Sequence, residues 1–164
     1  MQLNWTEIES ALNVVRQHVR PTPAYSWPQM KVRTGVDIVV KHENHTPTGS
    51  FKARGGLVFV DALHKRGATE GLVTATRGNH GQSIAMGASS VGIKSLIVVP
   101  QGNSIEKNAA MKAFGGALLE AGADFDEARR VAAKESASRN WVFVPSFHRD
   151  IVRGVSTYAL ELFT

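Results

Sequence analysis

Short apolar runs alternate with longer amphipathic stretches along most of the chain. Residues 6–19 place apolar side chains at helical spacing and begin with Thr6 and Glu9 in the pattern of a capping box, which predicts an N-terminal helix. Three prolines between positions 21 and 28 then predict an extended connection through about residue 30.

From residue 36 onward, the pattern predicts strict alternation of strands and helices. Strands are expected at 36–41, 72–75, 95–99, 117–121 and 141–144, and helices at 50–65, 80–91, 103–115 and 124–139. Strands of this length alternating with helices indicate βαβ units and a parallel sheet. The strands lack polar alternation, as expected for a sheet covered on both faces. The predicted fold class is therefore α/β, with three αβα layers around a parallel sheet.

Composition agrees with a folded domain of ordinary size. The chain has 164 residues, of which 43% are hydrophobic and 20% are charged, and these values exclude disorder, collagen and coiled coil. The formal net charge is +5, but the basic residues are scattered and their clusters, such as Arg129-Arg130, are short. This distribution favours a solvated surface over nucleic-acid binding, and it also suits an enzyme that handles anions.

Several classes of site and location are disfavoured by what the sequence lacks. Cysteine is absent, which excludes disulfides and cysteine-based metal sites, and His42 and His45 beside Glu43 lack a further ligand at metal-site spacing. The N-terminus does not resemble a signal peptide, and Leu96 to Val99, the longest aliphatic stretch, is too short to span a bilayer. We therefore expect no metal, no membrane partner and a cytoplasmic location.

Residues 47–56 form the first of two loops with the composition of a ligand site. In open parallel α/β sheets, ligands bind beyond the carboxyl ends of strands, where loops lead into helices. Ser50 or Thr48 can cap the helix that follows, which places Lys52 in a first turn where the helix dipole disfavours an ammonium group. A partly desolvated lysine there is a candidate imine-forming nucleophile. Spacing alone nevertheless favours an exposed surface lysine.

The second loop follows a predicted strand and opens a helix. It gathers hydroxyl, guanidinium, amide and imidazole groups around two glycines, in the order Thr74-Ala75-Thr76-Arg77-Gly78-Asn79-His80-Gly81-Gln82. Glycine lets backbone N–H groups approach an anion closely, and a helix N-terminus adds partial positive charge. We therefore expect an anion-binding site here. No GxGxxG or Walker sequence occurs, so a nucleotide site has no motif to support it.

Taken together, these segments resemble the threonine/serine dehydratase and serine racemase family of pyridoxal-phosphate (PLP) enzymes, fold type II, along almost the whole chain. The resemblance rests on Pro21-Thr22-Pro23, Lys41-His42-Glu43, Pro47-Thr48-Gly49-Ser50-Phe51-Lys52-Ala53-Arg54-Gly55, Gly78-Asn79-His80-Gly81-Gln82, Pro100 with Lys107, Gly115-Gly116, Gly122, and Gly154 to Glu161. The S-F-K-x-R-G and G-N-H-x-Q elements in this order are highly specific. With this resemblance, Lys52 is expected to be a functional residue and not an exposed surface lysine.

The resemblance implies a role for each matching residue. Lys52 would carry PLP and act as the base at the substrate α-carbon. Asn79 would hydrogen-bond the 3-hydroxyl oxygen of the cofactor, and Phe51 would help to position its ring. The loop Thr76-Arg77-Gly78-Asn79-His80 would receive the carboxylate of an amino-acid substrate. The reaction implied is loss of a β-hydroxyl, which yields a 2-keto acid and ammonia.

Arg77 departs from the family pattern, which usually has Ser or Ala before Gly-Asn-His. In the racemases a serine at this position serves as the second acid/base, so Arg77 argues against racemisation. Arg77 can instead pair with a substrate carboxylate, including the second carboxylate of a dicarboxylic hydroxy-amino acid. An arginine that turns to solvent or pairs structurally explains the sequence equally well.

The resemblance also implies a division into domains. Residues 49–145 correspond to the small α/β domain of the family, and residues 1–48 and 146–164 to two incomplete pieces of its large domain. Family members continue well beyond the equivalent of Thr164, and the glycine-rich loop that cradles the PLP phosphate lies in that further part. We therefore expect a fragment or truncated product that binds PLP weakly and is inactive by itself.

Two alternatives remain open. The chain can be a non-catalytic module that forms a homo-oligomer through exposed apolar surface. The surface expected to be uncovered is terminal and comprises Ile151, Val152, Val155, Tyr158, Leu160, Leu162 and Phe163. Alternatively, the chain belongs to a sister enzyme of the same fold type, such as a hydroxyaspartate dehydratase or a serine racemase. The sequence does not choose among serine, threonine and hydroxyaspartate as substrate.

Overall fold

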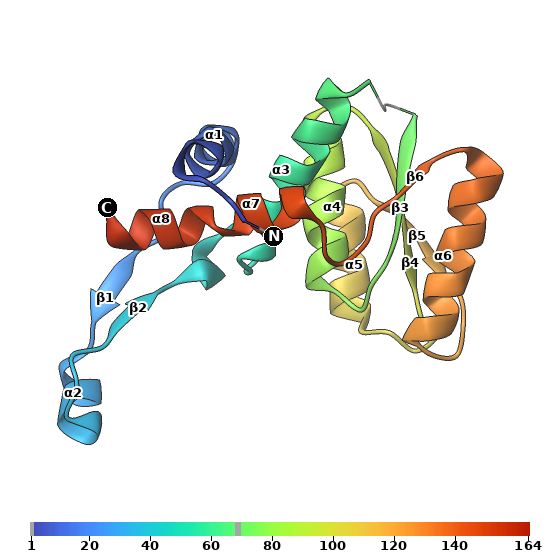
Figure 1. Cartoon of the computed structure of the whole chain (residues 1–164). Helices are drawn as coiled ribbons and strands as arrows, with labels where there is room; N and C mark the ends of the chain where they lie inside the picture. The colour runs from blue at the N-terminus through green and yellow to red at the C-terminus, as the bar shows by residue number, and fades with distance from the viewer. Residues whose placement is uncertain (1, 68–69) are drawn as a thin grey trace.

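A sheet of four parallel strands lies at the centre of the computed structural model, which describes residues 2–67 and 70–164 (Figure 1). The strand order is β5-β4-β3-β6. The strands are β3 (Gly71–Ala75), β4 (Lys94–Val99), β5 (Ala117–Glu120) and β6 (Val142–Phe143). The prediction of a parallel sheet is confirmed for these strands.

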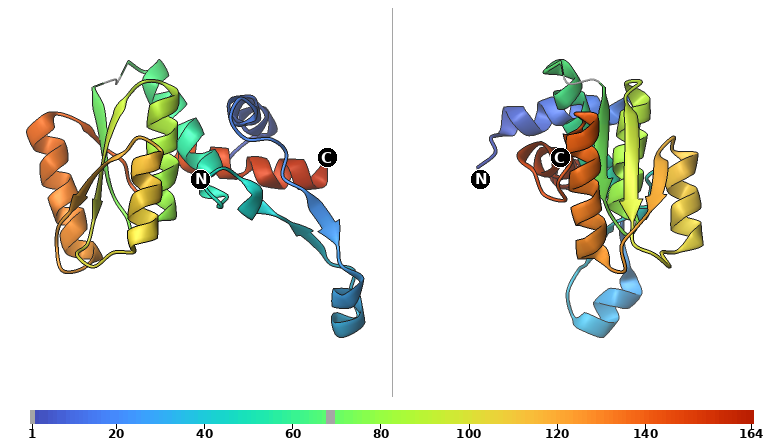
Figure 2. Two further views of the ribbon diagram at one scale, coloured as in Figure 1. Left: turned by 180° about the vertical axis from the view of Figure 1, so that it is seen from behind. Right: turned by 90° about the vertical axis from the view of Figure 1, so that its right-hand side faces the viewer.

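Helices cover both faces of this sheet (Figures 1 and 2). Helices α4 (Asn79–Ser90) and α5 (Ile105–Ala113) lie on one face, and α3 (Lys52–Lys65) packs against α4. Helix α6 (Phe125–Arg139) covers the other face. The three-layer α/β architecture is therefore confirmed.

The aliphatic strands are buried on both faces because their side chains alternate between the two helix layers. Val73 and Val98 pack toward α6 and its alanines, Ala128 and Ala132. Ile97, which points the other way, packs with residues of α4 and α5. This two-sided burial explains why the strands show no alternation of apolar and polar residues.

The N-terminal helix α1 (Trp5–Arg16) begins earlier than the sequence pattern predicts. The Asn4 side chain accepts a hydrogen bond from the Glu7 backbone N–H, and the Glu7 carboxylate accepts one from the Asn4 N–H. The predicted capping box of Thr6 and Glu9 is wrong because both residues lie inside the helix, where Glu9 accepts a hydrogen bond from the Trp5 indole. Helix α5 begins at Ile105, later than predicted, and is capped by Ser104.

Residues 24–41 form a projecting arm that the sequence did not predict (Figure 1). It consists of β1 (Ala24–Ser26), α2 (Pro28–Thr34) and β2 (Val39–Lys41). The strand predicted at 36–41 is shorter and pairs antiparallel with β1, outside the parallel sheet. The connection predicted to be extended contains a helix, because Pro28 suits a first helical position and Gly35 ends the helix at φ 74°.

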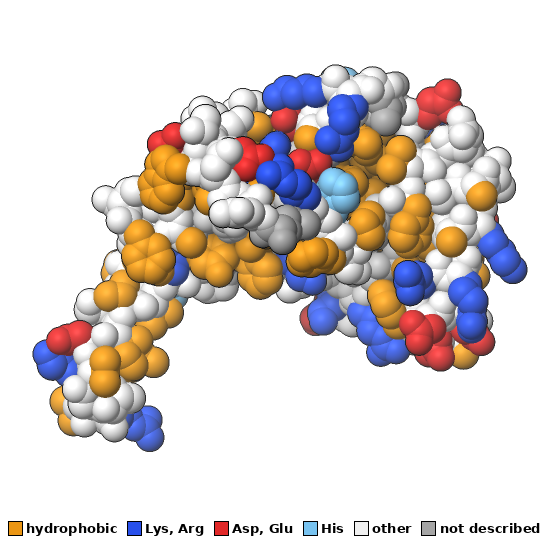
Figure 3. All heavy atoms as spheres, in the orientation of Figure 1, with side chains coloured by type: hydrophobic (Ala, Val, Ile, Leu, Met, Phe, Trp, Pro, Cys, Tyr) orange, Lys and Arg blue, Asp and Glu red, His pale blue; other side chains and the backbone are white. Residues whose placement is uncertain are grey.

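Many of the exposed apolar side chains lie on this arm (Figure 3). On the arm, Tyr25, Trp27, Met30, Val32, Val36 and Val39 are all exposed. Ile151 and Leu160 are buried, and of the predicted terminal patch only Phe163 is largely exposed, at 81%. Helices α1 and α3 pack against α7 and α8 and cover part of the predicted patch, whose other side chains are half-buried. Homo-oligomerisation itself stays a prediction.

The C-terminal residues form two short helices, α7 (Arg149–Val155) and α8 (Thr157–Phe163), which pack with α1 and α3. A side chain at Gly154 would place its Cβ 2.3 Å from the Arg54 carbonyl oxygen, so only glycine permits this close contact of α7 with α3. None of the helices in the described part of the chain is both long and apolar enough to cross a membrane.

A buried ion network centred on Arg54 joins the arm, α3 and α8. The Arg54 guanidinium is fully buried and donates to Glu43 through Nε at 2.7 Å and Nη2 at 2.9 Å. It also donates to Glu161 at 3.1 and 2.8 Å, and Lys41 Nζ lies 2.8 Å from the same carboxylate. Although burial raises the pKa of Glu161, hydrogen bonds from Arg54 and Lys41 hold it below its ordinary value.

Two threonines complete this network. Thr22 Oγ1 donates to Glu43 Oε1 at 2.6 Å, and Arg54 Nη1 donates to Thr157 Oγ1 at 3.2 Å. The network therefore includes residues from three segments that carry the family resemblance. They are Lys41-His42-Glu43, the segment 47–55 with Arg54, and the segment 154–161 with Thr157 and Glu161. Because Arg54 lies two residues after Lys52, the network also determines where the start of α3 is placed.

We predict that Arg54→Met destabilises the protein by about 3–5 kcal/mol, because two buried carboxylates lose their shared partner. The matched control is Lys65→Met, which removes a 68%-exposed lysine from its pair with Asp61 and is expected to cost less than about 1 kcal/mol. Urea unfolding of the three proteins measures both values. Equal destabilisation by the two substitutions would contradict a structural role for the network.

Candidate active site

Lys52 is the first residue of α3 and follows a tightly bonded turn. Thr46 Oγ1 accepts a hydrogen bond from the Ser50 N–H at 2.9 Å and donates to the Ser50 carbonyl at 2.8 Å. Gly49 occupies the left-handed region at φ 65°, which favours glycine in this turn. Phe51 occupies the N-cap position without a capping bond from its side chain, and Ser50 Oγ, as the sequence allowed, accepts a hydrogen bond from the Lys52 N–H at 3.3 Å.

The second predicted loop joins β3 to α4 and is organised by the hydroxyl of Thr76. Thr76 Oγ1 accepts hydrogen bonds from the backbone N–H of Gly78 at 3.0 Å and of Gly81 at 3.3 Å. The Gln82 N–H donates to the Gly78 carbonyl. Within residues 2–67 and 70–164, the N–H groups of Asn79 and His80 have no hydrogen-bond acceptor. These two donors therefore remain for an anion.

A close crossing of α3 and α4 brings the two loops together. A Cβ at Gly56, one turn after Lys52, would lie 2.3 Å from the Ser83 carbonyl oxygen, so a larger residue would push the helices apart. Ser83 lies one turn after the start of α4, and its Oγ donates to the His80 carbonyl at 2.7 Å. The first turns of the two helices consequently face one cavity.

This cavity has a volume of about 220 Å³ and combines one amine with largely apolar walls. Lys52 and His80 line it from the first turns of α3 and α4. The other lining residues are Phe51, Ser83, Ser146, Phe147, Ile151, Val152 and Val155. The arrangement suits a planar apolar group beside a nucleophilic amine.

The His80 imidazole is neutral at physiological pH. Burial and the nearby charge of Lys52 lower the pKa of His80 to about 4, and a hydrogen bond with the Val144 backbone opposes this shift only in part. The side chain is 6% exposed, and its Nε2 is buried without a hydrogen-bond partner among the described residues. Neutrality of this ring avoids placing a second positive charge beside the lysine.

The structure brings together some of the residues expected at this site and leaves others apart. Phe51, Lys52 and His80 line the same cavity. Arg77 and Asn79 are exposed and are not among the residues that line it. Thr76 is buried, and its hydroxyl serves the loop itself. The functions expected for these residues, and for Gly78 between them, stay predictions.

Sequence reasoning did not assign six of the lining residues to the site: Ser83, Ser146 and Phe147 were not named, and Ile151, Val152 and Val155 were expected only in a terminal apolar patch. Ser83 could have been found, because it lies three positions after His80 and so on the same helix face. Ser146 and Phe147 follow β6 at a distance in sequence that no local pattern relates to Lys52. No group of three His, Asp or Glu residues suited to a metal ion occurs in the described segments.

Comparison with known proteins supports a single family. A family model described as "Pyridoxal-phosphate dependent enzyme" matches residues 15–164. The biosynthetic L-threonine dehydratase of Haemophilus influenzae is 35% identical over 149 residues, which are 90% of this chain and 29% of that enzyme. The L-threo-3-hydroxyaspartate ammonia-lyase of Saccharomyces cerevisiae is 27% identical over 95% of this chain and 48% of its own length.

Solved structures agree with the sequence relatives. A pyridoxal 5'-phosphate-dependent aspartate racemase superposes with a TM-score of 0.92 at 30% identity, over 99% of this chain and 51% of that protein. The chain therefore spans from under a third to about half of the length of these proteins.

We predict that His80 makes the stability of the protein depend on pH between about 4 and 6.5. The folded-state pKa lies below the ordinary value of 6.5, so the unfolded chain binds the proton first and stability falls as the pH decreases through this window. The expected loss is about 3 kcal/mol relative to His80→Gln. Urea unfolding at pH 7 and pH 4 measures it.

His64→Gln serves as the control for this measurement, because His64 is exposed on α3. It should leave the pH dependence of the wild type unchanged. If His80→Gln also leaves that dependence unchanged, His80 does not titrate as the burial of its ring requires.

Proposed function

Because the chain belongs to the family of pyridoxal-phosphate dependent enzymes, we propose that it supplies the lysine-bearing part of a threonine/serine dehydratase active site. Such an ammonia-lyase converts a hydroxy-amino acid to a 2-keto acid and ammonia. The observation that carries this proposal is that Lys52, in the first turn of α3, and His80, in the first turn of α4, line the same apolar cavity. The activity of the threonine dehydratase relative supports the reaction class.

The residues of this cavity fit the ring and the aldehyde of PLP. The primary amine of Lys52 is the group that reacts with an aldehyde, and the walls formed by Phe51, Phe147 and Val155 suit a flat aromatic ring. When bound, PLP supplies an electron sink for the carbanion at the substrate α-carbon. The buried Nε2 of His80 is a polar atom that still lacks a partner.

The protein groups would hold and orient the reactants. Lys52 would form the covalent link to the cofactor and hold the proton removed from the α-carbon at its Nζ. The free N–H groups of Asn79 and His80 would receive the substrate carboxylate on the loop that Thr76 stabilises. The apolar residues of α7 would exclude water from one wall of the cavity.

The domain organisation proposed for the chain follows the same family pattern. Residues 49–145 would form the small domain, since they contain the parallel sheet and the helices α3 to α6. Residues 1–48 and 146–164 would belong to a large domain. The cavity lining offers no cation besides Lys52 for the PLP phosphate, and the sequence has no tetraglycine-type loop. We therefore propose that this chain alone binds PLP weakly.

We predict that incubation with PLP followed by borohydride reduction labels Lys52 in preference to the exposed lysines. Peptide mass mapping identifies the modified residue. Lys52→Ala should abolish the dominant label, whereas Lys65→Ala, a change at the other end of the same helix, should leave it unchanged. Label spread evenly over the surface lysines would contradict the proposed site.

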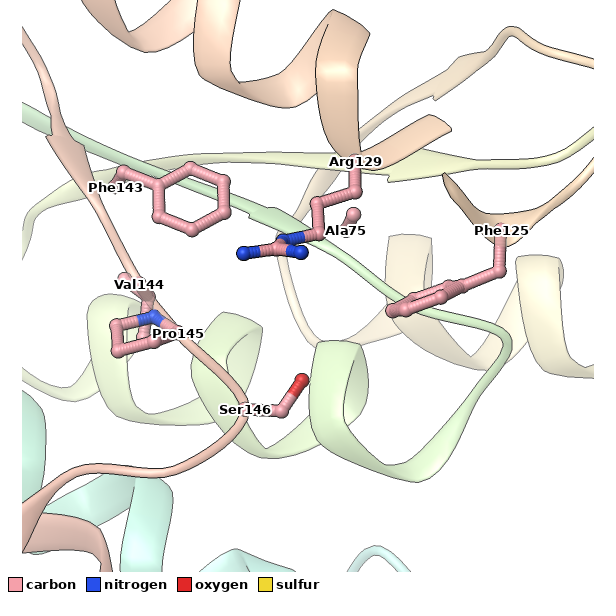
Figure 4. A pocket seen from close by; sticks show the side chains of 7 residues that line it. All are labelled: Ala75, Phe125, Arg129, Phe143, Val144, Pro145 and Ser146. Atoms are coloured by element: carbon pink, nitrogen blue, oxygen red, sulfur yellow. The ribbon is translucent and has the colours of Figure 1, made fainter. Parts of the chain in front are cut away.

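A dicarboxylic hydroxy-amino acid is a second candidate substrate, and a separate cavity favours it. This cavity, of about 240 Å³, is lined by Ala75 at the end of β3, by Val144 and Ser146 after β6, and by Arg129 of α6. Figure 4 shows the Arg129 guanidinium projecting among these residues. Ser146 also lines the cavity of Lys52, so the two spaces share a wall.

Arg129 could therefore hold a second carboxylate while Lys52 acts on the α-carbon. The hydroxyaspartate ammonia-lyase and the aspartate racemase, both similar to this chain, act on dicarboxylic amino acids as their names state, which supports such a substrate class. Arg77, which the sequence offered for this role, is exposed and does not line this cavity.

We predict that succinate, but not propionate, shifts the backbone amide signal of Ser146 in NMR titrations, because only the dicarboxylate has a further charge for Arg129. Arg129→Gln should weaken succinate binding roughly fivefold to tenfold. Arg130→Gln, on the adjacent position of α6, should not. Equal responses to the two acids would remove the support for a dicarboxylic substrate.

A further inference from the structure

Gly78, in the loop between β3 and α4, is a glycine for a steric reason. Its φ is 167°, an extended conformation that any residue adopts. A Cβ at this position would lie 2.8 Å from Cδ of Lys107 and 3.5 Å from its Cε. The absence of a side chain at Gly78 therefore lets the aliphatic stem of Lys107 lie directly against the loop.

Lys107 reaches this loop from another element of the fold. It is the third residue of α5, in the first turn that Ser104 caps by accepting a hydrogen bond from the Lys107 N–H at 3.3 Å. A cation in the first turn of a helix opposes the helix dipole. Among the residues that the structure describes, no carboxylate forms a salt bridge with Lys107, so its charge has no structural partner to offset this cost.

The surface that Lys107 adjoins already has the donors of an anion site. The N–H groups of Gly78, Gly81 and Gln82 are satisfied within the loop, which leaves those of Asn79 and His80 at the start of α4. The His80 side chain is buried on the side of the loop that lines the Lys52 cavity, and its Nε2 lacks a partner among the described residues. The loop thus has internal hydrogen bonds and two free backbone donors, and the stem of Lys107 lies against it at Gly78.

We propose that Lys107 is the cation that holds the substrate α-carboxylate at the loop of residues 76–80. The stem of Lys107 packs on Gly78 and carries its ammonium to the edge of the loop, where it adds charge to the two free backbone donors. This inference rests on the proposed function and deepens it, because it assigns the charge partner of the carboxylate to α5. Under this proposal, the two carboxylates of a dicarboxylic substrate would have different cationic partners, Lys107 for the α-carboxylate and Arg129 for the second.

The test measures carboxylate binding without cofactor or turnover. Acetate is titrated into the isotope-labelled chain at constant ionic strength, and the amide signals of Asn79 and His80 are followed by NMR. Lys107→Met keeps the aliphatic stem and removes the charge, and it should weaken acetate binding roughly fivefold. Lys107→Arg should retain binding. Lys112→Met, at an exposed lysine of the same helix, should leave it unchanged.

A double-mutant cycle tests the packing of Lys107 on Gly78. Gly78→Ala should displace Lys107 and weaken acetate binding in the wild-type background, but have no further effect in Lys107→Met. Acetate binding to Lys107→Met with wild-type affinity would overturn the proposal, as would the absence of any response at Asn79 and His80 in the wild type. Labelling of Lys52 by PLP and borohydride does not depend on Lys107, so that experiment separates failure of this inference from failure of the proposed function.

Discussion

The fully buried guanidinium of Arg54 is the interaction on which the arrangement of this chain depends. It forms hydrogen bonds to Glu43 beside the arm and to Glu161 in α8, and these carboxylates also bond to Thr22 and Lys41. A buried ion pair contributes little net stability over an apolar contact, but it is demanding in geometry, because each unpaired charge is costly. The network therefore specifies how the arm, α3 and α8 are placed relative to one another, and with them the first turn that carries Lys52.

The candidate site follows from this placement and from one steric constraint. Gly56 lets α3 approach the backbone of Ser83 in α4, which brings the starts of both helices to the same cavity. Both helix N-termini disfavour positive charge, and the site nevertheless holds Lys52 in one first turn. The neutral His80 limits the local positive charge, while the two free N–H groups of α4 favour an anionic ligand. The site thus combines the amine of Lys52, an apolar cavity, and the loop of residues 76–80 with its two free N–H donors.

Much of the fold could be predicted from the sequence because its strands and helices are locally consistent. The parallel sheet and the helices of its two layers followed from apolar periodicity, and the S-F-K-x-R-G and G-N-H-x-Q motifs located Lys52 and His80. The arm was missed because its three prolines predicted an extended chain, whereas residues 28–34 form a helix that begins at Pro28. In addition, β2 pairs with β1 and not with the main sheet. The burial of Ile151 and Leu160 within the predicted terminal patch was missed because it depends on α1 and α3, which lie far away in sequence.

The sequence by itself determined the fold class, the family and the position of the candidate lysine, Lys52, since these depend on local periodicity and on short contiguous motifs. Only the tertiary structure decided what the other motif residues do. Arg54, Glu43 and Glu161 are held in one buried network although 118 positions separate the last two. Thr76 serves its own loop, and Lys107 lies against Gly78. The physical reason is that charge pairing and close packing depend on distances in space between residues that the chain itself keeps far apart.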